Sequence, residues 1–136
     1  MTFKDSIEKL IESLVKLTLN GNVTWTQPLI APFNRVETSI DETVFTFYVT
    51  WKLELETGWS LQKGWVQIRD ETSNFDFTVF HFNFPELMSK LQDYLCEIHF
   101  NKLKPSESDI VDIVDMITKK LSIEELRDRN IGTILD

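Results

Sequence analysis

Hydrophobic and polar positions alternate most regularly over residues 44–56. Phe, Val, Trp and Leu fill the odd-numbered positions from 45 to 55, and Thr, Tyr, Lys and Glu fill the even-numbered ones. Because successive side chains of a β-strand point to opposite faces, this pattern predicts one long strand with a packed odd-numbered face. Thr57-Gly58 predicts a hairpin turn, and residues 59–69 predict a return strand with a β-bulge near Gly64.

Three further segments extend the predicted sheet. Residues 22–27 and 35–40 have the alternation of short strands, and a turn follows at Asp41-Glu42. Residues 75–84 form the last strand and become apolar on both faces towards their end. Pro28 and Pro32 enclose an apolar segment, which either covers the core or faces a partner, because proline donates no hydrogen bond to a sheet.

Helical periodicity marks both ends of the chain. Residues 2–19 repeat apolar positions every three or four residues after a capping box of Thr2 and Asp5, and Asn20-Gly21 ends the helix. A second helix begins at Pro85, where the missing amide costs nothing. Its expected buried stripe consists of Leu87, Leu91, Tyr94, Leu95 and Ile98.

The last part of the chain predicts two further helices after a break at Pro105. Ser106 with Asp109 signals the start of the first, and Ser122 with Glu125 signals the start of a short last helix. Gly132 is expected to end that helix. These two helices either complete the core or form an oligomer arm.

The resulting fold class is α+β, with a four- or five-stranded antiparallel β-meander packed by an N-terminal helix and C-terminal helices. The length of 136 residues is typical of a single domain. Within it, residues 1–104 are expected to form the core and residues 105–136 a helical extension.

The segment Gly21-Asn22-Val23-Thr24-Trp25 matches the pattern G-x-V-x-W after a helix. In this respect the chain resembles small uncharacterised bacterial and phage proteins, in which a helix, such a strand, a β-meander and a closing helix follow one another. The resemblance covers roughly residues 5–100 and implies an α+β fold and a microbial or viral source. It implies no functional residues, and the helices beyond residue 101 depart from that layout.

The formal net charge of −8 restricts the classes of partner. Nucleic acids and anionic membranes are recognised by basic surfaces, so direct binding to either is not expected. A protein with a basic surface fits this charge, although an acidic chain can also simply be a soluble one. No apolar run has the length of a signal peptide or a membrane span, so we expect a cytoplasmic location, in the host cytoplasm if the protein is phage-encoded.

Candidate chemistry is sparse, and we expect neither an enzyme, nor a metal site, nor a cofactor. The chain has one cysteine, Cys96, and two histidines, His81 and His99, without the spacing of metal ligands. Cys96 and His99 lie three residues apart, but no oxyanion donor or glycine-rich turn stands near them. We expect Cys96 to be a core residue and both histidines to be structural.

Aromatic residues exceed what one face of a small sheet can bury. The candidates for a partner surface are Tyr48, Trp59 and Trp65, and the phenylalanines of residues 79–84 add to the surplus. Asp109, Asp112 and Asp115 form an acidic stripe, which either docks a basic partner or is a solvated helix face.

Three functions follow from these features. The leading hypothesis is a small non-enzymatic protein-binding module, such as an immunity protein or a phage-encoded inhibitor, which occludes a target protein and forms a homo-oligomer, in particular a homodimer. The alternative is a module that binds a small molecule or nucleotide between sheet and helix or at a subunit interface. An enzyme built on His81 or the Cys96–His99 pair is the third.

Overall fold

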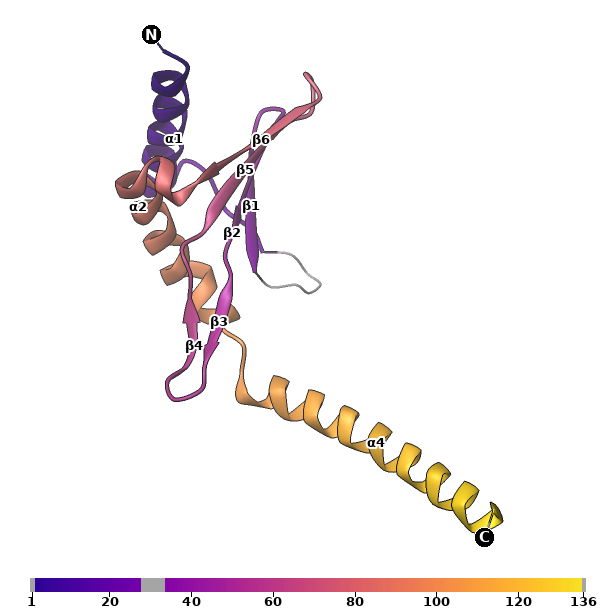
Figure 1. Cartoon of the computed structure of the whole chain (residues 1–136). Coiled ribbons are helices and arrows are strands. Elements are labelled where there is room, and N and C mark those ends of the chain that lie inside the picture. Colours follow the sequence, from indigo (N-terminus) through magenta and orange to yellow (C-terminus); the bar gives the residue numbers. More distant parts are fainter. Residues whose placement is uncertain (1, 28–33, 136) are drawn as a thin grey trace. The chain divides into compact units, whose positions relative to one another are not determined.

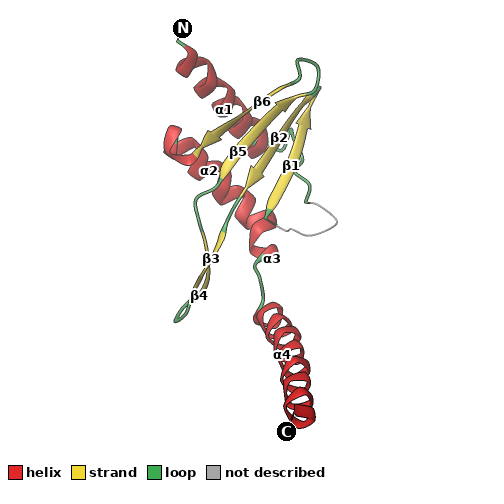
Figure 2. Cartoon of the chain, turned by 45° about the vertical axis from the view of Figure 1, so that its right-hand side comes forward, coloured by secondary structure: helices red, strands yellow, loops and turns green. Residues whose placement is uncertain are grey.

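The computed structural model describes residues 2–27 and 34–135, with side chains described as far as residue 124. The segment between Pro28 and Pro32, expected to cover the core or face a partner, lies outside these residues. The chain divides into two compact units, Met1–Lys104 and Pro105–Asp136. The first unit joins helices to antiparallel sheets, which confirms the α+β class (Figures 1 and 2).

Four strands of the first unit form one antiparallel sheet in the order β1-β2-β5-β6. Their bounds are Arg35–Ile40 for β1, Thr43–Tyr48 for β2, Trp65–Asp70 for β5 and Phe75–Phe80 for β6. A second sheet, the hairpin of β3 (Trp51–Glu54) and β4 (Gly58–Leu61), is inserted between β2 and β5. The meander is therefore present, but it divides into four strands plus two.

One face of the four-stranded sheet packs against two helices. Register places Val36, Phe47, Val66 and Val79 side by side across the four strands, and all four are buried. They share one core with residues of α1 (Phe3–Leu19) and α2 (Pro85–Leu95). Figure 2 shows both helices on the same side of this sheet. Burial of this inner face is what joins sheet and helices, since apolar burial is the main favourable term in folding.

Helix α1 begins and ends as its sequence predicts. The Thr2 hydroxyl accepts the Asp5 amide at 3.1 Å, and the Asp5 carboxylate accepts the Thr2 amide, which completes the capping box. At its other end, the Thr18 hydroxyl accepts the indole N–H of Trp25 at 3.0 Å, and both residues are buried. Residues 22–27 were expected to form a strand, but only Thr26 makes a bridge, to Glu37.

The predicted long strand of residues 44–56 and its return strand are each interrupted. The first breaks after Tyr48 and the second between Leu61 and Trp65, so the bulge expected near Gly64 is a complete interruption. The Gln92 side chain of α2 binds both sides of this break, because its oxygen accepts the Gly64 amide at 2.7 Å and its nitrogen donates to the Gln62 carbonyl at 3.1 Å. At the break, these two backbone groups therefore form hydrogen bonds with a helix side chain.

The interruption also changes which side chains of the long strand are packed. Trp51 and Leu61 pack against the core, whereas Leu53 is exposed and Leu55 is 95% exposed. The expectation of a packed odd-numbered face as far as Leu55 is thus wrong beyond Trp51. The physical reason is that β3 belongs to the separate hairpin, where the alternation has no second layer to face within the described residues.

The last predicted strand ends earlier than its apolar pattern indicated. β6 stops at Phe80, and residues His81–Asn83 form a 3₁₀ turn before α2. The Asn83 side chain accepts the Phe80 amide at 2.8 Å, which turns the chain out of the sheet. As a result Phe84 is buried, whereas Phe82 is exposed.

Helix α2 begins at Pro85 as expected, but its buried stripe differs at its end. Met88, Leu91 and Leu95 are buried, and Ile98 is exposed. A π-helical stretch, Cys96–Phe100, follows α2 and precedes the short helix α3 (Asn101–Leu103). Because a π turn is wider than an α turn, it shifts the phase of the stripe, and Phe100 enters the core where Ile98 was expected.

The second unit contains one helix, α4 (Glu107–Leu135), where two were expected. Its start agrees with the sequence, since the Asp109 carboxylate accepts the Ser106 amide at 2.8 Å. The Ser122 hydroxyl donates to the Thr118 carbonyl one turn earlier, so Ser122 lies inside the helix instead of capping a new one. Gly132 also lies within α4 and does not end it.

Replacement of Gly64 should test how closely the strands approach at the break. An alanine Cβ there would lie against the Tyr48 carbonyl oxygen and 2.5 Å from the Phe47 ring. We expect Gly64→Ala to lower the free energy of unfolding by about 3 kcal/mol in urea denaturation, because buried atoms would have to move.

Gly21→Ala provides the control for backbone strain alone. Gly21 has a φ of +74°, and nothing lies within 4 Å of an added Cβ. This substitution should cost only about 1 kcal/mol, the strain of the left-handed conformation. Equal losses for the two variants would contradict the close packing at Gly64.

Candidate functional site

Four aromatic side chains form a surface at one end of the four-stranded sheet. Register sets Tyr48 of β2 opposite Trp65 of β5, and Trp65 opposite Phe80 of β6. These positions alternate with the buried inner residues, so they lie on the outer face of the sheet. Phe82 from the 3₁₀ turn stacks on Phe80. We call Tyr48, Trp65, Phe80 and Phe82 the aromatic row.

Contacts within the aromatic row hold its rings in two stacked pairs. The ring centroids of Tyr48 and Trp65 lie 5.5 Å apart with planes at 10°, and those of Phe80 and Phe82 lie 5.5 Å apart at 4°. The Tyr48 hydroxyl also donates to the Gln67 side chain at 3.2 Å. Aromatic side chains fixed in this way lose little further freedom on binding, which favours affinity.

Exposure makes the aromatic row unusual. Phe80 is 46% exposed and Phe82 is 74% exposed, while Tyr48 and Trp65 are half-buried. The helices α1 and α2 pack on the opposite face of the sheet. Large apolar groups gathered on one surface are typical of a binding site.

Part of this surface could be predicted from the sequence. Tyr48 and Trp65 were candidates and are in contact. Phe80 and Phe82 belong to the surplus of phenylalanines over residues 79–84. Their exposure depends on the turn that Asn83 makes, which the apolar pattern does not predict. Trp59 lies elsewhere, in the hairpin, where it faces Leu53 across the strands.

The three candidate aspartates lie in the second unit, on α4, and all are exposed. Asp109 has a structural role, because its carboxylate accepts hydrogen bonds from the amide and hydroxyl of Ser106. Asp112 and Asp115 follow at intervals of three residues, so the three carboxylates share one broad side of the helix. Asp112 and Asp115 make no ion pair among the described residues.

The candidate groups for catalysis have ordinary structural surroundings. Burial, and next the negative charge of Asp93, raise the pKa of the Cys96 thiol to about 11. A protonated thiol is a poor nucleophile. Burial lowers the pKa of His99, against the effect of a hydrogen bond with the Trp25 backbone.

His81 makes a contact that resembles a catalytic pair. Its Nε2 lies 2.9 Å from the Ser89 hydroxyl, and partial burial, followed by the charge of Lys63, lowers its pKa. A serine nucleophile also needs a group that orients the histidine and an oxyanion hole. Among the described residues, no carboxylate accepts a hydrogen bond from His81.

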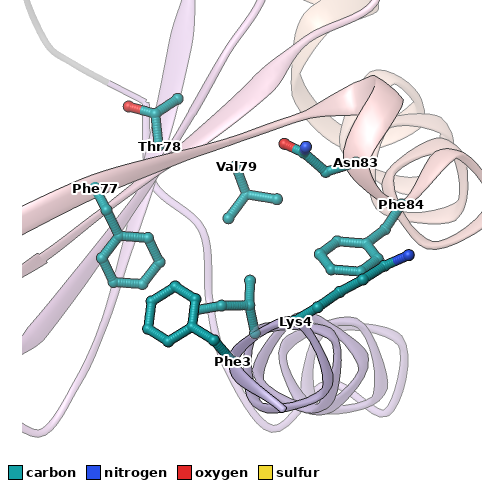
Figure 3. Close-up of a pocket in the computed structure, with 8 residues that line it drawn as sticks. Phe3, Lys4, Phe77, Thr78, Val79, Asn83 and Phe84 are labelled. Atoms are coloured by element: carbon teal, nitrogen blue, oxygen red, sulfur yellow. The ribbon is translucent and has the colours of Figure 1, made fainter.

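A pocket of about 320 Å³ opens between α1 and β6. Figure 3 shows Phe3, Phe77, Val79 and Phe84 around it, with Lys4 and Asn83 at its border. Its size lies at the lower end of small-molecule sites, and its lining is mainly apolar with few polar groups, as is common for such sites.

The remaining comparisons are negative. Over the described part of the chain, no group of three or more His, Cys, Asp or Glu side chains could hold a metal ion. None of the helices searched there combines the length and apolar character that a bilayer crossing requires. No family model, curated protein or solved structure matches the chain.

Proposed function

We propose that this chain is a small non-enzymatic protein-binding module that occludes a target protein, in the manner of an immunity protein or a phage-encoded inhibitor. The observation that supports it best is the aromatic row of Tyr48, Trp65, Phe80 and Phe82. Tyrosine and tryptophan are enriched among the residues that dominate binding energy in protein interfaces. The row offers one tyrosine, one tryptophan and two phenylalanines, already held in position by stacking.

The chemistry of the row and the net charge favour the same kind of target. The faces of aromatic rings attract ammonium and guanidinium groups. The chain's charge of −8 attracts a basic protein from a distance and speeds encounter. Lysine and arginine side chains of the target would therefore lie over the rings.

The proposal also includes the cellular location and the self-association that the sequence predicts. It places the protein in the cytoplasm, or in the host cytoplasm if it is phage-encoded, consistent with the resemblance to small bacterial and phage proteins. It also includes a homodimer, for which the chain offers a second apolar surface on α4.

Substitution of the two exposed phenylalanines tests the aromatic row. We expect Phe80→Ser with Phe82→Ser to weaken target binding by a factor of about 30 or more, which corresponds to the loss of interface anchors. The target is identified by affinity capture from the source cells, and the dissociation constant is then measured by calorimetry.

Leu55→Ser is the matched control, because Leu55 is 95% exposed and lies in the loop of the separate hairpin. It should bind like the wild type. Circular dichroism checks that each variant is folded. A double variant that is folded and binds the target with unchanged affinity would show that the aromatic row is not the contact.

Charge reversal on α4 tests whether the aspartates steer the target. Replacement of Asp112 and Asp115 by lysine should slow association several-fold at low salt and weaken its salt dependence, because long-range attraction is reduced. Asp109→Lys is added as a separate step, because Asp109 also caps α4. Stopped-flow measurement of the association rate follows both effects.

The control for this change reverses the same number of charges elsewhere, at Glu8 and Glu56. Both are exposed and make no ion pair among the described residues. Association that slows equally in both variants, or in neither, would contradict local steering by the aspartates.

The alternative function, a small-molecule module, is favoured by one observation, the pocket between α1 and β6. If it is correct, mass spectrometry of gently desalted protein should reveal a bound compound. Ile7→Trp, which fills the pocket, should remove that added mass, whereas Leu10→Trp on the same helix should keep it. A wild-type protein that carries no added mass contradicts this alternative.

A further inference from the structure

Helix α4 carries an apolar stripe that no other described residue of the second unit covers. Ile110 is half-buried, and Val114, Ile117 and Leu121 are exposed. Their spacing of four, three and four residues keeps them on one side of the helix, within about 60° at 3.6 residues per turn. This is the spacing of the a and d positions of a coiled coil, with isoleucine at the d positions. We call these four residues the α4 stripe.

The residues beside the α4 stripe help to identify what covers it. Exposed Ile113 and Val111 flank it on either side, and no charged residue lies within it from Ile110 to Leu121. Asp112 and Asp115 lie on the opposite side of the helix, by the same helical geometry. A basic target would therefore find no carboxylate within the stripe.

We infer that α4 is a self-association helix, which pairs in antiparallel orientation with α4 of a second copy of the chain. In this pairing Ile110 packs against the second copy's Leu121, and Val114 packs against its Ile117. Two-fold symmetry repeats both contacts. The charge-free surface of one copy is thus covered by an identical charge-free surface of the other, as an isologous dimer requires.

Charge decides the direction of the pairing. Antiparallel helices place Lys120, at the edge of the stripe, beside Asp109 of the second copy, and symmetry makes this contact twice. In a parallel pair, two-fold symmetry would put Lys120 of one copy and Asp109 of the other on opposite edges of the interface, so this contact would not form. Isoleucine at the d positions is also unfavourable in parallel two-stranded coiled coils, which prefer leucine there.

A lipid surface is a poorer occupant of the α4 stripe. Helices that lie in a membrane interface carry lysine and arginine on their polar face, which attract anionic lipids. The side of α4 opposite the stripe carries Asp112 and Asp115 with Lys119, so its formal charge there is negative. These two carboxylates stay exposed in the antiparallel pair, so dimer formation leaves them free to attract a basic target.

This inference rests on the self-association included in the proposed function, but it is independent of target binding. The chain has a mass of 16.0 kDa. We expect the full-length wild type to have twice this mass by light scattering after size exclusion, and to dissociate on dilution. Ile117→Asp should raise the dissociation constant of the dimer by at least about 100-fold, since it brings two carboxylates into the apolar contact.

Met116→Asp is the matched control. Met116 is adjacent in sequence and 65% exposed, against 58% for Ile117, but lies away from the stripe. Its variant has the same change in charge and a similar change in helix propensity, and it should remain a dimer. A monomeric wild type would overturn the self-association as a whole. An Ile117→Asp dimer as tight as the wild type, or a Met116→Asp monomer, would overturn the α4 stripe as its surface.

Disulfide cross-linking tests the orientation in a Cys96→Ala background. Ile110→Cys and Leu121→Cys chains should cross-link when they are mixed, because antiparallel pairing sets these two positions opposite each other. Ile110→Cys chains alone should remain uncross-linked, because antiparallel pairing separates the two copies of this position by about 16 Å along the helix axis. Cross-linking of the Ile110→Cys chains alone, without the mixed product, would overturn the antiparallel direction.

Discussion

The close approach at Gly64 determines how the first unit is divided. No side chain fits at this position, because the Tyr48 carbonyl and the Phe47 ring already occupy the space, and the Gln92 side chain bonds the Gly64 amide and the Gln62 carbonyl. The sheet therefore stops and restarts at Trp65. Because β5 begins there, Trp65 faces Tyr48 on one side and Phe80 on the other. The position of the aromatic row thus follows from the absence of one Cβ atom.

Local features of the structure could be predicted from the sequence, because neighbouring residues determine them. The Thr2–Asp5 box, Pro85 at the start of α2 and the Ser106–Asp109 pair all act within one turn of a helix. The alternation over residues 44–56 likewise predicted the strands of residues 44–48 and 51–54, but not the break between them. These interactions depend on spacing along the chain, which is what a sequence displays.

Features that depend on distant residues could not be predicted in this way. The break at Gly64 requires Gln92, which lies 28 residues further along the chain. Ser122 has the sequence signature of a helix cap, but its hydroxyl donates to the preceding turn, and the two arrangements share the same residue types. For the candidate site, Tyr48 and Trp65 could be named from the surplus of aromatic residues, but their contact depends on the register of β2 and β5. The exposure of Phe82 likewise depends on where Asn83 turns the chain.

The inserted hairpin β3–β4 also bears on how the chain folds. β1 with β2, and β5 with β6, are joined by short turns, so only β2 and β5 must meet across a long intervening segment. The hairpin pairs Trp51 with Leu61 inside that segment, and so brings the ends of β2 and β5 near each other before they pair. The entropy lost on closing a loop grows with its effective length, which this pairing shortens. The hairpin therefore lets the central strand pair of the sheet close as a series of local steps, which favours rapid folding.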